Sequence, residues 1–227
     1  MSIIKSVKGR QVFDSRGNPT VEAEVILQDG SVGTSIVPSG ASTGKHEAHE
    51  LRDKNIEYLN KSVFNAVNNI NHKISQALLD KNSTHQNKLD EILINLDGTE
   101  NKSNIGANAI LAVSIANLKA AAKFSKREIY KYINNGIAKP IFNMPYPLMN
   151  IINGGAHANN SLEIQEFMIR PDGANNFKEC MKMSFLVIQN LKKYFEGKKI
   201  STSVGDEGGF APSLRSDEEA IEIIMKS

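Results

Sequence analysis

Apolar residues occupy every second position from Val21 to Leu27, and the first two positions between them are glutamates. This period of two is typical of a β-strand with one buried face. The dipeptide Asp29-Gly30 follows directly and precedes a second short run that ends at Val37. Because such a dipeptide between two alternating runs favours a tight turn, the pattern predicts a β-hairpin.

From Lys61 the spacing changes, and apolar residues recur every three or four positions as far as Leu78. That spacing places them on one face of an amphipathic helix. Two further helical stretches are predicted over residues 84–94 and 107–124. Strands followed by a group of helices are typical of an α+β domain and not of a βαβ repeat.

A break in the pattern follows residue 133. Asn134-Asn135-Gly136 and the prolines at 140, 145 and 147 interrupt any periodicity there. We place a domain boundary near residue 138, with an α+β domain over 1–138 and a second domain over 139–227. The second domain alternates strands with helices. We expect strands at 148–152, 163–169 and 200–204, a helix over 177–195, and a last helix that opens with a capping box of Ser216 and Glu219.

Composition and charge narrow the class of protein. The 227 residues, 40% apolar and 23% charged, are ordinary for a globular chain, and the net charge of +2 lacks the basic excess of a nucleic-acid-binding protein. The single cysteine, Cys180, cannot form an internal disulfide, which fits a reducing compartment. No secretory leader and no apolar run of membrane-spanning length is recognisable. We therefore expect a cytoplasmic protein with neither a nucleic-acid partner nor a membrane span.

Two short strings imitate well-known motifs without meeting their requirements. Residues 39–45 resemble a phosphate-binding P-loop, but Ser39 stands where glycine is needed and His46 where serine or threonine is needed. The histidines of residues 46–50 are three positions apart, whereas a zincin motif needs four. A dinucleotide-binding G-x-G-x-x-G string is missing from the sequence.

Acidic and imidazole groups follow the predicted strands of the second domain. His157 comes after the first strand, Gln165 and Glu166 lie within the second, and Glu207 follows the third between glycines. An α/β barrel gathers its active site at such strand ends, and glycines let the backbone approach a ligand closely. Taken alone, His157 is compatible with a structural histidine and Glu207 with a simple turn. Their combination favours a site in which a carboxyl group donates a proton.

Seven strings, in order along essentially the whole chain, resemble the enolase family in its bacterial type. They cover residues 14–22, 38–44, 96–102, 106–114, 149–155, 165–169 and 204–209. The resemblance implies an α+β capping domain followed by a TIM-type barrel, modified so that it begins with two strands and two helices. It also implies the reversible dehydration of 2-phosphoglycerate to phosphoenolpyruvate with Mg²⁺, in a protein that forms a homodimer when complete.

The same resemblance implies roles for individual residues. Glu207 corresponds to the proton donor for the departing hydroxyl, with a pKa raised by burial and neighbouring carboxylates. Glu166 and His157 correspond to the catalytic pair that lines the substrate pocket, and Gln165 to a residue that contacts the substrate. Ser42 corresponds to a substrate-side residue that binds the second magnesium ion when its loop closes. A regular strand would point Gln165 and Glu166 to opposite faces. Both side chains can therefore reach one pocket only if the strand is bulged or ends there.

The last segment is short for the fold that the resemblance implies. Residues 140–227 number 88, whereas a β/α barrel takes about 200–250 residues. The barrel is therefore incomplete, and the resemblance implies that the primary magnesium ligands and the lysine base are absent from this chain. We expect either a fragment of a longer enolase or a shortened, inactive relative. Two alternatives remain open: a non-catalytic interaction module for an intact enolase subunit, and a small phosphate-binding protein that uses residues 39–44.

Overall fold

The computed structural model describes residues 1–40, 44–134 and 142–227, and the chain divides into two compact units. Unit 1 is Met1–Pro140 and unit 2 is Ile141–Ser227. The predicted boundary near residue 138 falls outside the described residues. Each unit has its own sheet, its own helices and its own apolar core.

Unit 1 contains a three-stranded antiparallel sheet in the order β1-β2-β3. Its strands are β1 (Ile4–Phe13), β2 (Pro19–Leu27) and β3 (Val32–Val37). In the turn between β2 and β3, the Gly30 amide donates to the Leu27 carbonyl at 3.0 Å, and the Leu27 amide donates to the Ser31 carbonyl at 2.9 Å. The predicted hairpin is therefore confirmed. The sequence pattern did not reveal β1, whose pairing register shifts between Ile4 and Ser6.

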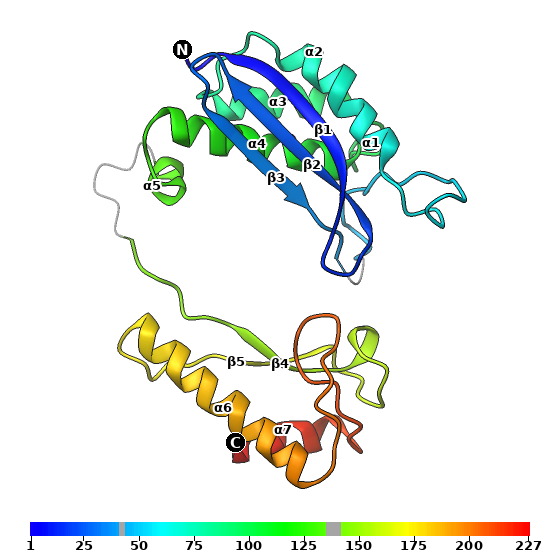
Figure 1. Ribbon diagram of the computed structural model, residues 1–227, viewed down its shortest axis with the longest axis vertical. Helices are drawn as coiled ribbons and strands as arrows, with labels where there is room; N and C mark the ends of the chain where they lie inside the picture. Colours follow the sequence, from blue (N-terminus) through cyan, green and yellow to red (C-terminus); the bar gives the residue numbers. More distant parts are fainter. Residues whose placement is uncertain (41–43, 135–141) are drawn as a thin grey trace. The chain divides into compact units, whose positions relative to one another are not determined.

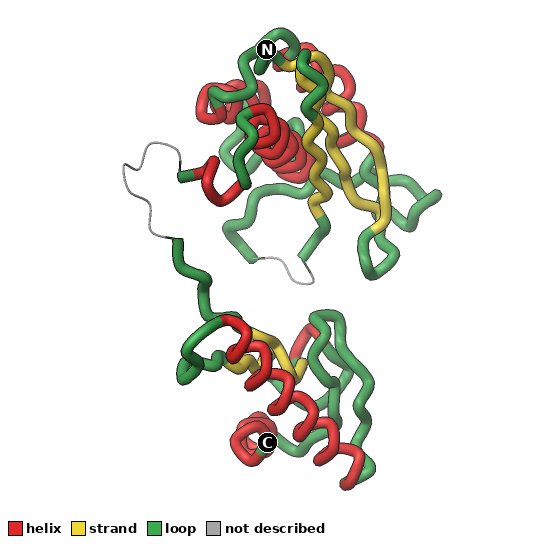
Figure 2. Tube along the Cα trace, turned by 60° about the vertical axis from the view of Figure 1, so that its left-hand side comes forward, coloured by secondary structure: helices red, strands yellow, loops and turns green. Residues whose placement is uncertain are grey.

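Helices of unit 1 pack against this sheet. The predicted helix from Lys61 is present as α1 (Phe64–Asn69), a π-helical turn η1 (Ile70–Ile74) and α2 (Ser75–Leu78). Next come α3 (Gln86–Asp97), α4 (Ala107–Phe124), whose bounds equal the predicted ones, and the short helix α5 (Ile129–Ile133), which was not predicted. Figure 1 and Figure 2 both draw α4 alongside the strands, and η1 contacts β1.

The core of unit 1 lies between the sheet and these helices. The alternating residues of β2 from Val21 to Leu27 are fully buried, as are Ile70 and Ile74 of η1. Full burial of a valine, leucine or isoleucine side chain stabilises a fold by about 1.5–3 kcal/mol. The lack of a side chain at Gly33 of β3 allows α4 to lie close to the sheet, because a Cβ atom there would be 2.0 Å from the Ala116 carbonyl oxygen. This unit is the α+β domain that the sequence predicts.

Unit 2 contains a two-stranded antiparallel sheet of β4 (Met149–Asn153) and β5 (Glu166–Ile169). Two helices accompany it, α6 (Phe177–Gly197) and α7 (Asp217–Lys226). The core combines apolar residues of the strands with the C-terminal half of α6 and one face of α7. Over residues 142–227 the strands do not close into a barrel, so this unit supplies only the first part of one.

One predicted strand of unit 2 is wrong. Residues 200–204 form no strand; Val204 makes a single bridge to Phe210, which makes another to Ile152 of β4. A strand needs a ladder of backbone hydrogen bonds to a neighbour, and no described residue continues such a ladder beyond these bridges. Val204 is accordingly 64% exposed.

Both long helices of unit 2 begin with a side-chain cap. Asn176 accepts a hydrogen bond from the Glu179 amide at 3.0 Å, and the Ser216 hydroxyl accepts one from the Glu219 amide at 3.3 Å. The predicted capping box is present in one direction only, because the Glu219 carboxylate accepts from the Arg215 amide and not from Ser216. Among the helices of the described ranges, none combines the length and apolar character needed to cross a bilayer.

Candidate functional site

Three segments of unit 2 meet at the end of β4. The strand leads into a 3-10 turn η2 (Gly155–His157), β5 begins alongside it, and the loop over residues 204–210 returns to the same place. The Phe210 amide donates to the Ile151 carbonyl at 2.9 Å, and the Asn153 amide donates to the Phe210 carbonyl at 2.8 Å. These bonds attach the loop that carries Glu207 to the strand that leads to His157.

Glycines make this attachment possible. A Cβ atom on Gly209 would lie 2.5 Å from the Asn153 Oδ1 atom, and one on Gly205 would lie 2.6 Å from Asn153 Nδ2. Real Cβ atoms do not approach other atoms so closely, so larger residues at either position would push the loop away from β4. The Asp206 amide also donates to the His157 carbonyl at 3.2 Å. The Gly-Asp-Glu-Gly-Gly string therefore packs against the end of β4.

His157 is buried, with 5% of its surface exposed, and neither ring nitrogen has a hydrogen-bond partner among the described residues. Its Nδ1 atom lies 3.5 Å from Oε1 of Glu166, close enough for an ion pair when the imidazole is protonated. Buried polar atoms in folded proteins are nearly always hydrogen-bonded. An imidazole left without partners beside a carboxylate is therefore well placed to bind a polar ligand.

Gln165 and Glu166 lie at the point where β5 begins, so their side chains need not alternate between the two faces of the sheet. β5 begins at Glu166, and Gln165 precedes it in a bend of the chain. The Gly154 amide donates to the Gln165 carbonyl at 3.0 Å, and a Cβ atom on Gly155 would lie 2.9 Å from the Gln165 Cγ atom. The backbone of Gln165 therefore packs against the turn that leads to His157, while its side chain is exposed.

Glu207 differs from the expectation in one respect. It lies in the short loop between Asp206 and Gly208, and its side chain is exposed. The expected burial, which would raise the pKa of a proton-donating carboxyl, is not present, and this part of the prediction is corrected. The physical reason is local: within unit 2 the loop contacts β4 and η2 through its backbone, and no described residue covers its outer side.

Ser42 lies outside the described residues, so the structure does not describe how this residue is placed. Its described neighbours in unit 1 are held firmly. The Ser39 hydroxyl donates to Glu50 Oε1 at 2.6 Å, and the Arg16 guanidinium donates to the Ser39 carbonyl at 2.5 Å. Arg52 donates both to the Ser39 hydroxyl and to Glu50. The chain entering the 41–43 segment is therefore anchored in unit 1.

The described residues do not form a metal site. No group of three or more histidine, cysteine, aspartate or glutamate side chains gathers closely enough in residues 1–40, 44–134 and 142–227 to hold an ion. The site at the end of β4 has the imidazole of His157 in its neighbourhood, with the carboxylates of Glu166, Asp206 and Glu207 on the adjoining segments, but these do not form the cluster of oxygen ligands that Mg²⁺ prefers. Its groups are suited to hydrogen bonding and to proton transfer.

Asn153 is the residue that sequence reasoning missed. It is fully buried, its Oδ1 atom accepts from Asn150 Nδ2 at 2.7 Å, and its Nδ2 atom has no partner among the residues described. Its carbonyl accepts from Asn160 Nδ2 at 2.9 Å, which connects β4 to the following loop. The signal for it was its place at the end of a strand before two glycines, where a polar side chain faces a close backbone approach.

Comparisons with known proteins give matches to both units. Residues 4–133 match the family described as Enolase, N-terminal domain, and residues 141–227 match Enolase, C-terminal TIM barrel domain. A curated relative named Enolase, from Pelagibacter ubique (strain HTCC1062), is 57% identical over 226 residues, which is 99% of this chain and 53% of the relative. The chain thus spans about half the length of the curated relative that it matches. These matches cover both units and show that the chain belongs to the enolase family.

Proposed function

We propose that this chain contributes the proton-donor side of an enolase active site, which dehydrates 2-phosphoglycerate reversibly to phosphoenolpyruvate. The observation that carries the proposal is the attachment of the Glu207 loop to the end of β4, where the Asp206 amide donates to the His157 carbonyl at 3.2 Å. This contact brings His157, Glu166 and Glu207 into one neighbourhood. The family match supports this reaction, and the local geometry supports the roles.

Glu207 is the proposed proton donor. Elimination of water from 2-phosphoglycerate needs a proton at the departing hydroxyl oxygen, and a neutral carboxyl group can supply it. Gly208 follows Glu207 with a φ of 86°, a left-handed conformation that favours glycine, and a Cβ atom there would meet nothing within 4 Å. A donor of this kind has to be covered so that it stays protonated. The proposal therefore requires further residues of the complete fold over Glu207, which is exposed in unit 2.

His157, Glu166 and Gln165 are the proposed substrate-binding groups. The free ring nitrogens of His157 can hydrogen-bond to substrate oxygens, and Glu166 at 3.5 Å favours one orientation of the imidazole. Gln165, immediately before β5, has an exposed side-chain amide that is free to contact the substrate, since it makes no hydrogen bond in the described ranges. Binding and orientation by these groups would bring the departing hydroxyl to Glu207.

Magnesium belongs to this proposal only for the complete active site. The described residues do not fit a resident ion, so the steps proposed for this chain involve its own side chains alone. The enolase resemblance assigns the second ion to Ser42 and the first to acidic residues that this chain does not contain. We propose that the lysine base, like the ligands of the first ion, lies in residues that this chain does not contain. We also propose that the complete protein is a homodimer in the cytoplasm.

Two measurements test the proposal. The purified chain alone should produce no phosphoenolpyruvate above background, because base and primary metal ligands are absent. A chimera in which the remaining residues of the Pelagibacter relative follow Ser227 should be active with Mg²⁺. In that chimera Glu207→Gln should lower kcat by about 10²–10⁴, the usual contribution of general acid–base catalysis. Glu222→Gln is the matched control and should keep full activity, because Glu222 is an exposed carboxylate on α7 whose one salt bridge among the described residues is to Lys226.

Clear turnover by the 227-residue chain alone would contradict the proposed division of the active site. An active chimera in which Glu207→Gln is harmless would remove Glu207 from the role of proton donor. The intact mass of the protein in its own cells tests the premise separately. A mass well above 24.9 kDa would mean that these residues work within a longer enolase, whereas a mass of 24.9 kDa would favour an inactive relative.

A further inference from the structure

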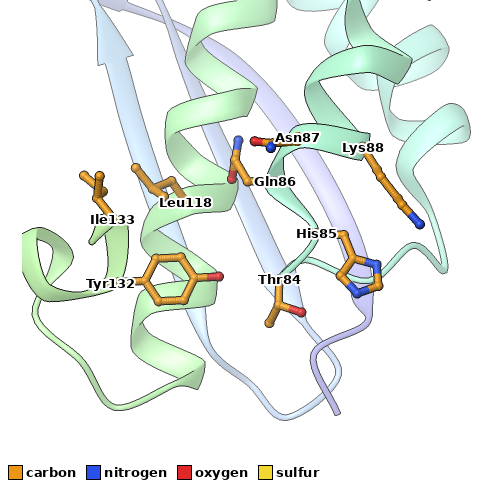
Figure 3. Close-up of a pocket in the computed structure, with 8 residues that line it drawn as sticks. All are labelled: Thr84, His85, Gln86, Asn87, Lys88, Leu118, Tyr132 and Ile133. Carbon is orange, nitrogen blue, oxygen red and sulfur yellow. The ribbon is translucent and has the colours of Figure 1, made fainter. Parts of the chain in front are cut away.

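A pocket of about 570 Å³ lies entirely within unit 1, between the beginning of α3, the C-terminal half of α4 and the short helix α5 (Figure 3). None of the residues proposed for the enolase reaction lines it. Its lining combines polar residues at the start of α3 with apolar residues of the other two helices: Thr84, His85, Gln86, Asn87, Lys88, Leu118, Tyr132 and Ile133. A volume of this size holds a small organic molecule.

The first turn of α3 offers unpaired donors to this pocket. His85 precedes the helix, its side chain makes no capping hydrogen bond, and the first turn contains no acidic residue. The amides of Gln86, Asn87 and Lys88 donate to none of the described residues. Lys88 is exposed and makes no ion pair within the described ranges. Free amides at a helix N-terminus, together with a nearby cation, attract an anion.

Tyr132 supplies an independent indication of a ligand. The residue is 9% exposed, yet its hydroxyl has no hydrogen-bond partner among the residues described. In Figure 3 the hydroxyl points from α5 across the pocket toward the start of α3. Burial raises the pKa of Tyr132, more than the Arg127 guanidinium lowers it, so the hydroxyl remains a neutral donor. The Tyr132 side chain is nine-tenths buried, but its hydroxyl oxygen stays accessible from the pocket and unpaired among the residues described, so it can donate a hydrogen bond to a ligand atom there.

The other walls of the pocket are rigid or apolar. The Gln86 amide nitrogen donates to Asp90 and to Ser114, and its oxygen accepts from Asn117, so this side chain is already occupied. Leu118 and Ile133 contribute hydrocarbon surface on the side of Tyr132. The pocket is thus positive and rich in donors along α3, and apolar with one hydroxyl along α4 and α5.

We propose that this pocket binds a small organic anion whose phosphate or carboxylate group sits at the first turn of α3 beside Lys88. The body of the ligand lies against Leu118 and Ile133 and presents an acceptor to the Tyr132 hydroxyl. The site is independent of the enolase reaction proposed for unit 2, so either proposal can fail while the other holds.

The test is a titration of the full 227-residue chain, labelled with ¹⁵N, with 4-carboxyphenyl phosphate, which carries an anionic group at each end of an apolar ring. Saturable shifts are expected at the amides of Gln86, Asn87 and Lys88. Lys88→Gln should weaken binding about fivefold or more, and Tyr132→Phe about threefold or more, the effect of one hydrogen bond. Lys73→Gln changes an exposed lysine that does not line the pocket and should leave binding unchanged. Inorganic phosphate should bind more weakly than the organic probe.

Three results would overturn the proposal. The first is the absence of saturable shifts at the three amides. The second is equal binding by Lys88→Gln and Lys73→Gln, both of which change surface residues and should fold normally. The third is equal affinity for inorganic phosphate and the organic probe, which would mean that the walls from α4 and α5 do not take part. Retained binding by a folded Tyr132→Phe chain would exclude the hydroxyl contact in particular.

Discussion

Unit 1 and unit 2 bury their apolar residues to very different extents. In unit 1 the helices pack against a three-stranded sheet, and one large cluster of buried side chains extends from β1 to α4. Unit 2 has a two-stranded sheet and a smaller cluster. Along α6 the C-terminal residues Leu191 and Phe195 are fully buried, whereas Phe177, Met181 and Phe185 are 42%, 44% and 59% exposed.

This difference shows whether each unit contains the packing partners that its own helices and strands need. Phe177, Met181 and Phe185 are four residues apart and share one face of α6. Exposed apolar residues in such a row mark a surface that is normally covered. A two-stranded sheet is also marginal without further packing. Unit 1 therefore contains the partners that its helices need, while unit 2 depends on partners that residues 142–227 do not provide.

The largest effect is expected when the two units are separated. A chain of residues 1–140 should unfold cooperatively in urea, because its core is complete. A chain of residues 141–227 should show a broad transition and bind an apolar dye, because α6 and the two-stranded sheet remain uncovered. Circular dichroism and dye fluorescence measure both. A sharp, cooperative transition of the 141–227 chain would refute the distinction between the units.

A substitution at the closest helix–sheet contact should be the next most damaging. A Cβ atom on Gly33 would lie 2.0 Å from the Ala116 carbonyl oxygen and 2.4 Å from the Ala120 amide nitrogen, both backbone atoms of α4. Gly33→Ala should therefore lower the free energy of unfolding of unit 1 by about 3 kcal/mol, as overpacking of a rigid core does. The transition of unit 1 in urea unfolding of the full chain gives this value.

Gly173→Ala is the matched control for that experiment in the full chain. A Cβ atom there would have no neighbour within 4 Å, and the backbone is not in the left-handed region. It should leave the stability of both units unchanged. If Gly33→Ala were equally harmless, α4 would not pack on β3 as tightly as the structure has it.

A buried carboxylate should make unit 1 sensitive to acid. Burial of Asp97 acts to raise its pKa, but hydrogen bonds from the Thr99 side chain and from the amides of Ile105, Thr99 and Asn104 outweigh burial and lower the pKa. The unfolded chain then binds this proton more readily than the folded one. The stabilisation is complete above the ordinary carboxyl pKa of about 4 and is lost as the pH falls through the lowered value.

Asp97→Asn should remove about 2 kcal/mol of that stability at neutral pH, in the range of hydrogen bonds to a charged group. The difference between the original chain and the variant should shrink as the pH falls from about 4 through the lowered pKa of Asp97, because below that value both chains are uncharged at this position. Unfolding free energies of the 1–140 chain between neutral and acidic pH measure this. Glu91→Gln, on the exposed side of α3, is the control and should not alter the pH profile.

The spacing of apolar residues in the sequence correctly predicted the strand β2 and the helix α4. The alternation of β2 and the apolar spacing of α4 were sufficient, because each element buries one regular face. β1 escaped because its bulge between Ile4 and Ser6 brings Ile4 and Val7 into the core three positions apart, which breaks the period of two. Residues 200–204 have strand-like composition, but no neighbouring strand pairs with them in the part of the chain that the structure describes.

The sequence likewise predicted one part of the candidate site, the segments that carry its residues, but not the burial of those residues. The strand ends predicted the segments that carry His157, Glu166 and Glu207, since short strings specify turns. Burial of His157 and exposure of Glu207 depend on which residues pack over each loop, and that information lies elsewhere in the chain. The contact of Gly205 and Gly209 with Asn153 joins positions far apart in the chain, and no local pattern of a single sequence reveals it.

The smallest predicted effect concerns the helix caps of unit 2. Asn176 accepts from the Glu179 amide at 3.0 Å and caps α6, whose C-terminal half contributes Leu191 and Phe195 to the core of unit 2. Asn176→Ala should cost about 1 kcal/mol, the usual value of an N-cap, whereas Ser213→Ala changes an exposed serine outside any helix and should cost nothing. Since unit 2 is incomplete, the loss should be measured in the chimera with the relative's remaining residues, by its midpoint of thermal unfolding.

A loss seen in the chimera but not in the 227-residue chain would mean that α6 becomes part of a cooperative unit only when its exposed face is covered. Equal losses in both chains would mean that unit 2 already folds cooperatively, which would remove the contrast with unit 1.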